Sequence, residues 1–243
     1  MVGEIHCRMQ MEPKLVALTF DDGPTRDGVD DILPILEEHD AKATFFLSGA
    51  EIEQYPEGAR RIADAGHELG NHGYSHRLMI LRLPGTYREE IERTDAMLRE
   101  AGEQNPIMFR PPYGRKLIGL PLEVRRQGYH MITWTVHEPA PGGTPEDYAA
   151  HILHQVRHGG IALMHPMHDR RETVIAALPL ILEGLDEMGF VTVTMSELLQ
   201  AGGVIEQGEQ PERPPVAAAK QIAKERIESG RPLTWEERRR RGF

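Results

Sequence analysis

The chain has 243 residues, 40% of which are hydrophobic, and this is enough to bury one sizeable core. Its formal net charge of -10 argues against a general affinity for nucleic acid. The same charge repels anionic polymers at long range, unless the binding cleft is locally positive. Cys7 is the single cysteine, so an intramolecular disulfide is excluded. No run of residues reaches the apolar length of a membrane-spanning helix.

Strand-like runs recur along the chain, and several are continuously apolar, which is typical of strands covered on both faces. The expected strands are residues 15–20, 43–47, 68–71, 107–110, 129–135, 160–164 and 190–194. Helix-like segments lie between them. In the first, Val29, Ile32, Leu33 and Leu36 have helical spacing, and Pro34 predicts a kink or a late start there. Further helices are expected near residues 56–65, 86–101, 116–127, 145–158 and 173–188.

This alternation of strands and helices predicts an α/β fold with a parallel sheet. We expect a distorted (β/α) barrel of seven or eight parallel strands, with a doubly wound open sheet as the alternative. Residues 1–200 form one expected catalytic domain. Residues 201–243 are rich in Pro, Gly, Gln, Glu and Arg, and they predict a polar tail with a helical stretch near residues 215–229. The tail is either solvated or a contact for a partner.

Polar clusters follow the expected strands. They cover residues 19–24, 71–76, 110–114, 134–137 and 163–165. In a parallel barrel the carboxyl ends of the strands meet on one face, where active sites are built. The coincidence of these clusters therefore predicts a single site.

Asp21, Asp22, His72 and His76 suggest a metal ion within that site. Adjacent carboxylates repel each other and need a compensating charge. Two imidazoles and one carboxylate form a three-ligand site that keeps one position open for water. Asp22 is the better ligand because Gly23 turns the chain directly after it, which leaves Asp21 as a base. Each motif alone is more often a turn or a coincidence, and their order along the chain favours a site.

The motifs together resemble the polysaccharide deacetylase superfamily, the NodB-homology domain of carbohydrate esterase family four. The resemblance extends from about Lys14 to Leu199. It rests on Thr-Phe-Asp-Asp-Gly-Pro at residues 19–24, Lys-Ala-Thr-Phe-Phe at 42–46, Gly-His-Glu-Leu-Gly-Asn-His at 66–72, Arg-Pro-Pro-Tyr-Gly at 110–114 and Leu-Met-His at 163–165.

The resemblance implies a metal-dependent hydrolase that removes acetyl groups from N-acetylated sugars. Asp21 resembles the general base, and Arg110 resembles the residue that holds it. His165 resembles the general acid that protonates the leaving amine. Tyr113 resembles the position whose backbone N–H faces the oxyanion.

The resemblance also implies one divalent ion. Its ligands would be Asp22, His72 and His76, with zinc favoured and cobalt or nickel as alternatives. The implied substrate-binding positions are Trp134, Leu163 and Pro112.

Two positions depart from the family pattern. Gly73 stands where a serine or threonine is usual, and Ser75 is the candidate to compensate for the lost hydroxyl. His137 stands where an aspartate usually orients the acid histidine, and Glu138 or Asp169 could replace it.

The leading hypothesis is deacetylation of a peptidoglycan-, chitin- or oligosaccharide-like substrate. One alternative is a non-sugar amide, which the altered position of His137 favours. Another is a catalytically weak glycan-binding module. The N-terminus shows no signal peptide, so the sequence as written predicts a cytoplasmic protein, with a secreted or cell-wall location if a leader is missing. The sequence leaves the oligomeric state open.

Overall fold

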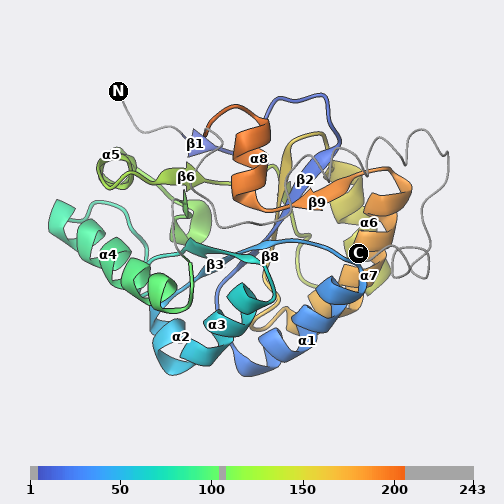
Figure 1. Cartoon of the computed structure of the whole chain (residues 1–243), viewed down its shortest axis with the longest axis horizontal. Coiled ribbons are helices and arrows are strands. Elements are labelled where there is room, and N and C mark those ends of the chain that lie inside the picture. The colour runs from blue at the N-terminus through green and yellow to red at the C-terminus, as the bar shows by residue number, and fades with distance from the viewer. Residues whose placement is uncertain (1–4, 104–107, 206–243) are drawn as a thin grey trace.

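The computed structural model describes residues 5–103 and 108–205 (Figure 1). The strands are β1 Ile5–His6, β2 Leu15–Asp21, β3 Thr44–Leu47, β4 Glu68–Asn71, β5 Met108–Phe109, β6 His130–Ile132, β7 Val136–His137, β8 Gly160–Met164 and β9 Val191–Val193. The helices are α1 Arg26–Glu38, α2 Gly49–Gln54, α3 Pro56–Asp64, α4 Pro84–Glu100, α5 Gly119–Arg126, α6 Pro145–Gln155, α7 Arg171–Glu187 and α8 Met195–Ala201, with a 3-10 turn at Pro112–Gly114.

The paired strands form one parallel sheet in the order β1-β6-β5-β4-β3-β2-β8-β7. Followed round the sheet, β2 to β6 are neighbours in sequence order, and β7 and β8 return to β2. The barrel is therefore open between β6 and β7, and β1 pairs with β6 at this open edge. β9 pairs with the first half of β2, whereas β3 pairs with its second half. The expected distorted (β/α) barrel is confirmed.

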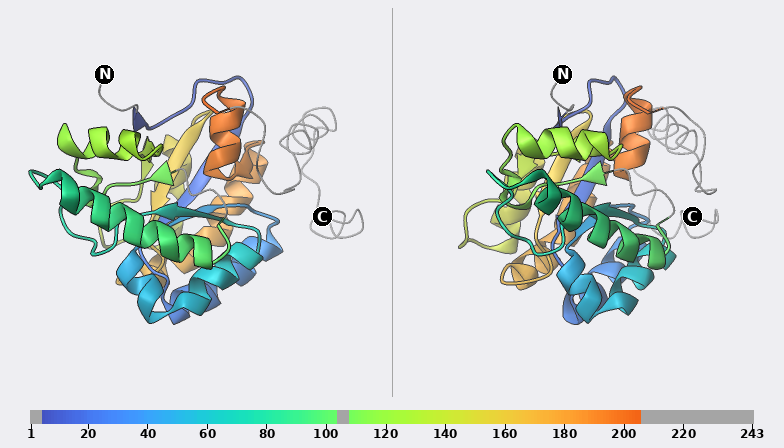
Figure 2. Two further views of the ribbon diagram at one scale, coloured as in Figure 1. Left: turned by 60° about the vertical axis from the view of Figure 1, so that its left-hand side comes forward. Right: turned by 90° about the vertical axis from the view of Figure 1, so that its left-hand side faces the viewer.

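Helices cover the outside of the curved sheet in the same circular order as the strands. Neighbouring pairs along this layer are α6 with α7, α7 with α1, α1 with α3, and α4 with α5. Figures 1 and 2 show this layer wrapped around one side of the sheet, while α8 lies apart from it beside β2. Every residue of β2, β3, β4 and β8 is buried. The sequence of β8 and most of the sequences of β2 and β3 are apolar, as expected for strands covered on both faces, whereas β4 buries the polar residues Glu68 and Asn71.

The largest apolar cluster lies between the sheet and the outer helices, and Phe20, Phe45, Ile152 and Leu178 are among its fully buried members. A second cluster joins α8 to the other side of the sheet, and Val204 and Ile205 pack against it. The described core therefore continues past residue 200, where the expected domain ends. The tail expected beyond it lies outside the described residues from residue 206 onward.

Most expected elements are present, and several of their boundaries differ from the expected ones by a few residues. The strands at Glu68–Asn71 and Gly160–Met164 match their predicted bounds. The expected strand at 129–135 is wrong in extent, because it ends at Ile132 and the chain re-enters the sheet as β7. The late start expected for the first helix is wrong: α1 begins at Arg26, where Thr25 caps it, and continues through Pro34. The elements β1, β7, α2 and α8 were not expected.

The strand register places the polar clusters at one level. Asp21 lies opposite Phe46, Leu47 opposite Asn71, and Asn71 opposite Phe109. On the other edge of β2, Phe20 lies opposite Met164. The residues that directly follow these strands are therefore brought to the same end of the barrel.

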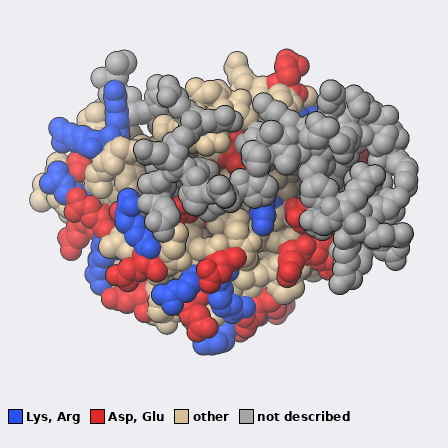
Figure 3. Space-filling model, in the orientation of Figure 1, with Lys and Arg blue, Asp and Glu red and all other residues tan. Residues whose placement is uncertain are grey.

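Within the described residues, no helix is both long enough and apolar enough to cross a membrane. In the view of Figure 3, Lys and Arg side chains are interspersed with Asp and Glu side chains over the helical side of the molecule. The part of that face left uncovered by grey residues therefore shows no extended region of one charge.

Candidate active site

Asp21 is a buried carboxylate held by a buried arginine. Its Oδ1 accepts a hydrogen bond of 2.6 Å from Nη1 of Arg110, which also donates to the Thr19 hydroxyl at 2.7 Å. The guanidinium carbon of Arg110 lies 4.0 Å from the centre of the Phe46 ring. Burial raises the pKa of Asp21, but the charge and the hydrogen bond of Arg110 outweigh it, and the pKa lies below its usual value. Asp21 is therefore ionised at neutral pH.

Asp22 has a different environment from its neighbour. It lies in the left-handed region, with φ of 72°, directly before Gly23. The backbone N–H of Gly23 donates to Oε2 of Glu51 on α2 at 2.7 Å, and the other carboxylate oxygen of Glu51 pairs with Nε2 of His168 at 2.5 Å. These contacts fix the turn after β2, and the Asp22 carboxylate lines a cavity.

His72 and His76 lie beside Asp22. Nε2 of His76 is 3.1 Å from Oδ1 of Asp22, and Nε2 of His72 is 3.9 Å from the same oxygen. Nδ1 of His72 lies 2.8 Å from the carbonyl oxygen of Arg110, so that nitrogen carries the proton and Nε2 presents its lone pair. Burial lowers the pKa of His72 despite the nearby carboxylates of Asp21 and Asp22, which keeps the ring neutral.

These three side chains fit a metal ion. One donor atom from each can be chosen so that all lie within 4.8 Å of one another. Ligands about 2.0–2.1 Å from a tetrahedral ion are about 3.3 Å apart, and the distances of 3.1 and 3.9 Å bracket this separation. Neutral imidazoles and an ionised carboxylate suit zinc, cobalt or nickel.

The loop that carries both histidines is braced by backbone hydrogen bonds and by Glu90 of α4. Oε2 of Glu90 accepts from the backbone N–H groups of Tyr74 and Ser75, and Oε1 accepts from the Ser75 hydroxyl at 2.6 Å. Gly73 has a φ of 78°, which glycine adopts without strain, and its carbonyl accepts from Gly49. Ser75 thus makes the bracing contact that Gly73 cannot make with a side chain.

His165 follows β8 and pairs with Glu138. Its Nδ1 lies 3.0 Å from Oε1 of Glu138, while Oε2 of Glu138 accepts from the Tyr148 hydroxyl at 2.8 Å. Nε of Arg170 lies 3.3 Å from Oε1. Burial lowers the pKa of His165, but the hydrogen bond and charge of Glu138 and the charge of Asp21 outweigh it, so the pKa is raised.

The structure places His137 away from His165. Its side chain is exposed, with Nδ1 3.2 Å from the backbone oxygen of Glu138 and its ring 5.8 Å from that of His151. Of the two carboxylates considered as replacements for the usual aspartate, Glu138 makes the contact with His165. The β7 strand ends at His137, so the next residue turns back toward the site.

An open cavity of about 900 Å³ lies over these groups. Trp134, Leu163 and Tyr113 line it, as do the three candidate metal ligands, Asp21 and His165. Trp134 stands on the segment between β6 and β7, where the barrel is open. Its ring lies against Gly114, where a Cβ would come within 2.5 Å of it. Tyr113 is 62% exposed, with φ of 60° and its ring 4.9 Å from that of His76.

Pro112 does not line the cavity. It is buried beside Gly73, and its expected contact with substrate stays a prediction. Arg110 is also fully buried, behind Asp21, as its expected part in holding that carboxylate requires.

The sequence interpretation missed several residues around the cavity. Arg77, Leu78, Arg82 and Arg115 line it from the loops after β4 and β5. Arg77 directly follows His76 and Arg115 directly follows Gly114, so attention to the residues flanking the motifs could have found these two. Glu51 lies inside a helix and had no sequence signal that connected it to the turn at Asp22.

The arrangement has a proton acceptor and a proton donor at a cluster that can hold a cation. Asp21 is ionised, and the raised pKa of His165 favours its protonated form. They come from neighbouring strands, β2 and β8, at the same level of the sheet. Such a site can activate a nucleophile and protonate a leaving group in one catalytic cycle.

Comparisons with known proteins agree with this geometry. The family model for polysaccharide deacetylase matches residues 8–132. A peptidoglycan-N-acetylglucosamine deacetylase of Bacillus cereus is 31% identical over 204 residues, which cover 82% of this chain and 94% of that relative.

Two solved structures have the same fold. One is a peptidoglycan N-acetylglucosamine deacetylase, with a TM-score of 0.77 and 30% identity over 81% of this chain and 92% of the other. The second is a mutant of a carbohydrate esterase family 4 pseudoenzyme of Bacillus anthracis, described as having restored enzymatic activity. It has a TM-score of 0.76 and 30% identity over 82% of this chain and 72% of the other.

Proposed function

Because the chain belongs to the polysaccharide deacetylase family, we propose that it is a metal-dependent hydrolase that removes the acetyl group from N-acetylated sugars of a peptidoglycan- or chitin-like glycan. One observation carries the proposal. A carboxylate held ionised by Arg110 and a histidine whose pKa is raised by Glu138 both line a cavity that also contains a candidate three-ligand cation site.

The proposed metal ligands are Asp22, His72 and His76, and zinc is the favoured ion. When bound, a divalent ion supplies a Lewis acid that polarises the amide carbonyl and makes a water molecule more acidic. The protein contributes preorganised donors. The hydrogen bond from His72 to the Arg110 carbonyl fixes the tautomer, and Glu90 fixes the loop that carries both histidines.

Asp21 is proposed to accept the proton from the attacking water. Arg110 lowers the basicity of this carboxylate and fixes its orientation by a hydrogen bond of 2.6 Å. An amide nitrogen is a poor leaving group unless it is protonated, and His165 is placed to supply that proton. Glu138 holds the imidazole through Nδ1, so Nε2 is the nitrogen that donates.

The other cavity residues are proposed to position the substrate. Trp134 and Leu163 present apolar surface suited to the acetyl methyl group and the sugar face. The backbone N–H of Tyr113, at the turn after β5, is proposed to stabilise the oxyanion that forms from the carbonyl oxygen.

A glycan-binding protein without activity is the second candidate, because a pseudoenzyme has a similar fold. A module that only binds needs neither a base nor an acid, and here both are present with their partners. The reason for preferring a non-sugar amide was the histidine at position 137. Since Glu138 pairs with His165, that reason no longer applies.

The test is release of acetate from short chitooligosaccharides and from peptidoglycan strands. Protein stripped by a chelator and then reloaded with zinc, cobalt or nickel should recover activity only when metal is present. The Asp21→Asn variant, loaded in the same way, is the control for contaminating hydrolases. Absence of acetate release from every glycan by fully loaded wild-type protein would favour the binding module.

A further inference from the structure

A carboxylate on α2 completes the hydrogen bonding of the turn that carries Asp22. The φ of 72° at Asp22 is unfavourable for a residue with a side chain and persists where neighbouring contacts maintain it. The Asp22 N–H donates to the carbonyl of Phe46, and the Gly23 carbonyl accepts from Ser48, each at 3.1 Å. The N–H of Gly23 donates to Oε2 of Glu51 at 2.7 Å. Because Gly23 is buried, loss of this acceptor would leave a buried donor without a partner.

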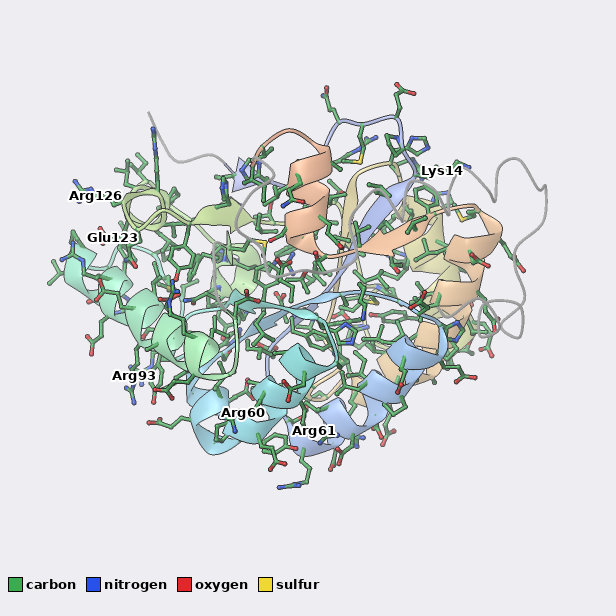
Figure 4. All side chains as sticks on the ribbon, viewed as in Figure 1. Lys14, Arg60, Arg61, Arg93, Glu123 and Arg126 are labelled. Atoms are coloured by element: carbon green, nitrogen blue, oxygen red, sulfur yellow. The ribbon has the colours of Figure 1, made fainter. Side chains whose placement is uncertain are left out.

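Glu51 serves the turn, whereas the other carboxylate of the same helix lies at the surface. Glu53 is exposed and pairs with Arg93 on α4, which Figure 4 labels. Oε1 of Glu51 lies 2.5 Å from Nε2 of His168, which supplies the cation that a half-buried carboxylate needs. Burial raises the pKa of Glu51, but the hydrogen bond and charge of His168 outweigh it, and the pKa lies below its usual value. The hydrogen bond to Glu51 in turn raises the pKa of His168.

His168 belongs to the loop that carries the candidate acid. It follows His165 in the segment between β8 and α7. The same segment packs directly on the turn after β2. The Thr25 hydroxyl donates to the carbonyl of Met167 at 2.9 Å, and a Cβ at Gly23 would lie 2.8 Å from Cγ of Met167. The acid loop and the turn are therefore in contact through packing and through hydrogen bonds.

We propose that Glu51 and His168 are positioning residues that hold Asp22 as a metal ligand, and that they couple the cation site to the loop that carries His165. Both lie outside the candidate ligand set and outside the lining of the cavity, so they act through the backbone at Gly23. Because coupling between two sites is reciprocal, a well-placed loop strengthens metal binding and a bound metal steadies the loop. The inference rests on the metal ligands of the proposed function.

The first measurement is zinc affinity by competition with a chelator, which does not depend on hydrolysis. Glu51→Leu removes both the acceptor and the charge and should weaken zinc binding about tenfold, the lower end of the range for groups that orient metal ligands. Glu51→Gln keeps an oxygen that accepts from Gly23 and should lose only about threefold, and His168→Gln about the same. The controls are Glu57→Gln on α3 and His154→Gln on α6, which change exposed residues and should leave the affinity unchanged.

Two comparisons separate positioning from a general structural role. The double variant Glu51→Gln with His168→Gln should bind zinc within about twofold of the weaker single variant, whereas independent roles would multiply the two losses. Urea unfolding of the metal-free variants gives their stability. Lower stability with wild-type zinc affinity in Glu51→Leu would overturn the proposal. Should Glu51→Leu fail to fold, wild-type affinity in both Glu51→Gln and His168→Gln would overturn it instead.

Hydrogen exchange tests the coupling to the acid loop. Saturating zinc should slow amide exchange in peptides covering residues 165–170 about threefold or more in wild-type protein, and His168→Gln should abolish this effect. Unchanged exchange in wild-type protein would reject the coupling. Weaker zinc binding in the variants, together with no acetate release by zinc-loaded wild-type protein, would keep the positioning roles and reject the hydrolase. Acetate release with unchanged zinc affinity in every variant would do the reverse.

Discussion

Replacing Glu138 with glutamine should shift the pH dependence of catalysis. The change keeps the shape of the side chain but removes the charge that pairs with His165 across 3.0 Å. Glu138 raises the pKa of His165, so its loss lowers that pKa, and the protonated acid disappears at a lower pH. The alkaline limb of the profile of kcat against pH should therefore move toward acid.

The size of the effect follows from the strength of one charged hydrogen bond. Such a bond contributes about 1.5–3 kcal/mol, and about 1.4 kcal/mol corresponds to a factor of ten. Turnover of Glu138→Gln on the alkaline limb should therefore fall about ten- to hundredfold. Because the His165 side chain is 32% exposed, the lower end of this range is expected. Toward acid pH the two proteins should converge.

The assay is acetate release at saturating substrate and metal across the pH range, with His137→Asp as the control. An aspartate at position 137 should leave the profile unchanged, because His137 is exposed and Glu138 already holds His165. A uniform loss in Glu138→Gln at every pH would refute the reasoning, since it would indicate a general structural role. A shift in His137→Asp would refute the assignment of the partner.

Three further predictions address the rest of the site. Asp21→Asn should keep its metal through dialysis and lose about two to four orders of magnitude in kcat. Asp22→Asn should instead lose the metal. Equal losses of metal in the two variants would contradict the division of roles between base and metal ligand. Arg110→Met should lower the free energy of unfolding in urea by about 3–5 kcal/mol, because it leaves the buried carboxylate of Asp21 without a cation, and adding Asp21→Asn should restore part of this loss. Glu90→Gln should weaken zinc affinity in a chelator competition more than Ser75→Ala, since it perturbs the acceptor of three hydrogen bonds, whereas Ser75→Ala removes only the one from the Ser75 hydroxyl; equal affinities would show that the loop needs no such bracing.

Family and fold were predictable because the chemistry of this site lies at strand ends. Continuous apolar runs such as those of β2 and β8 can be recognised from a sequence, and a polar cluster that follows each run locates the carboxyl end of the strand. A parallel sheet then brings these ends together without any further information. Asp22, His72 and His76 come together for this reason, although they lie on separate segments.

Elements that depend on tertiary contacts were not predictable. β1 and β7 have two residues each, too few for a periodic signal, and they exist because neighbouring strands provide hydrogen-bond partners. The length of the strand before Trp134 also depends on which neighbouring strands offer hydrogen-bond partners. The chain leaves the sheet there because the barrel is open at this point. The sequence pattern alone treated residues 129–135 as one strand.

The sequence narrowed the carboxylate partner of His165 to two candidates but did not show which of them makes the contact. Glu138 and Asp169 were both near enough along the chain, and only the turn after β7 decides which carboxylate reaches the ring. The cavity arginines were missed for a similar reason. Arg77 and Arg82 stand in a loop without a regular pattern, where sequence does not reveal which side chains face a cavity.

The contrasting surroundings of Asp21 and Asp22 have an evolutionary consequence. Because one carboxylate is held by Arg110 and its neighbour stands beside the histidines, the proposed mechanism implies that a change of Asp21 to asparagine alters proton transfer and leaves the three candidate metal ligands in place. Asparagine and aspartate codons differ by a single nucleotide. Under the proposed function, catalysis and glycan recognition can thus be uncoupled in one mutational step. In a lineage with this architecture, loss of turnover would free an already folded cleft for selection as a receptor.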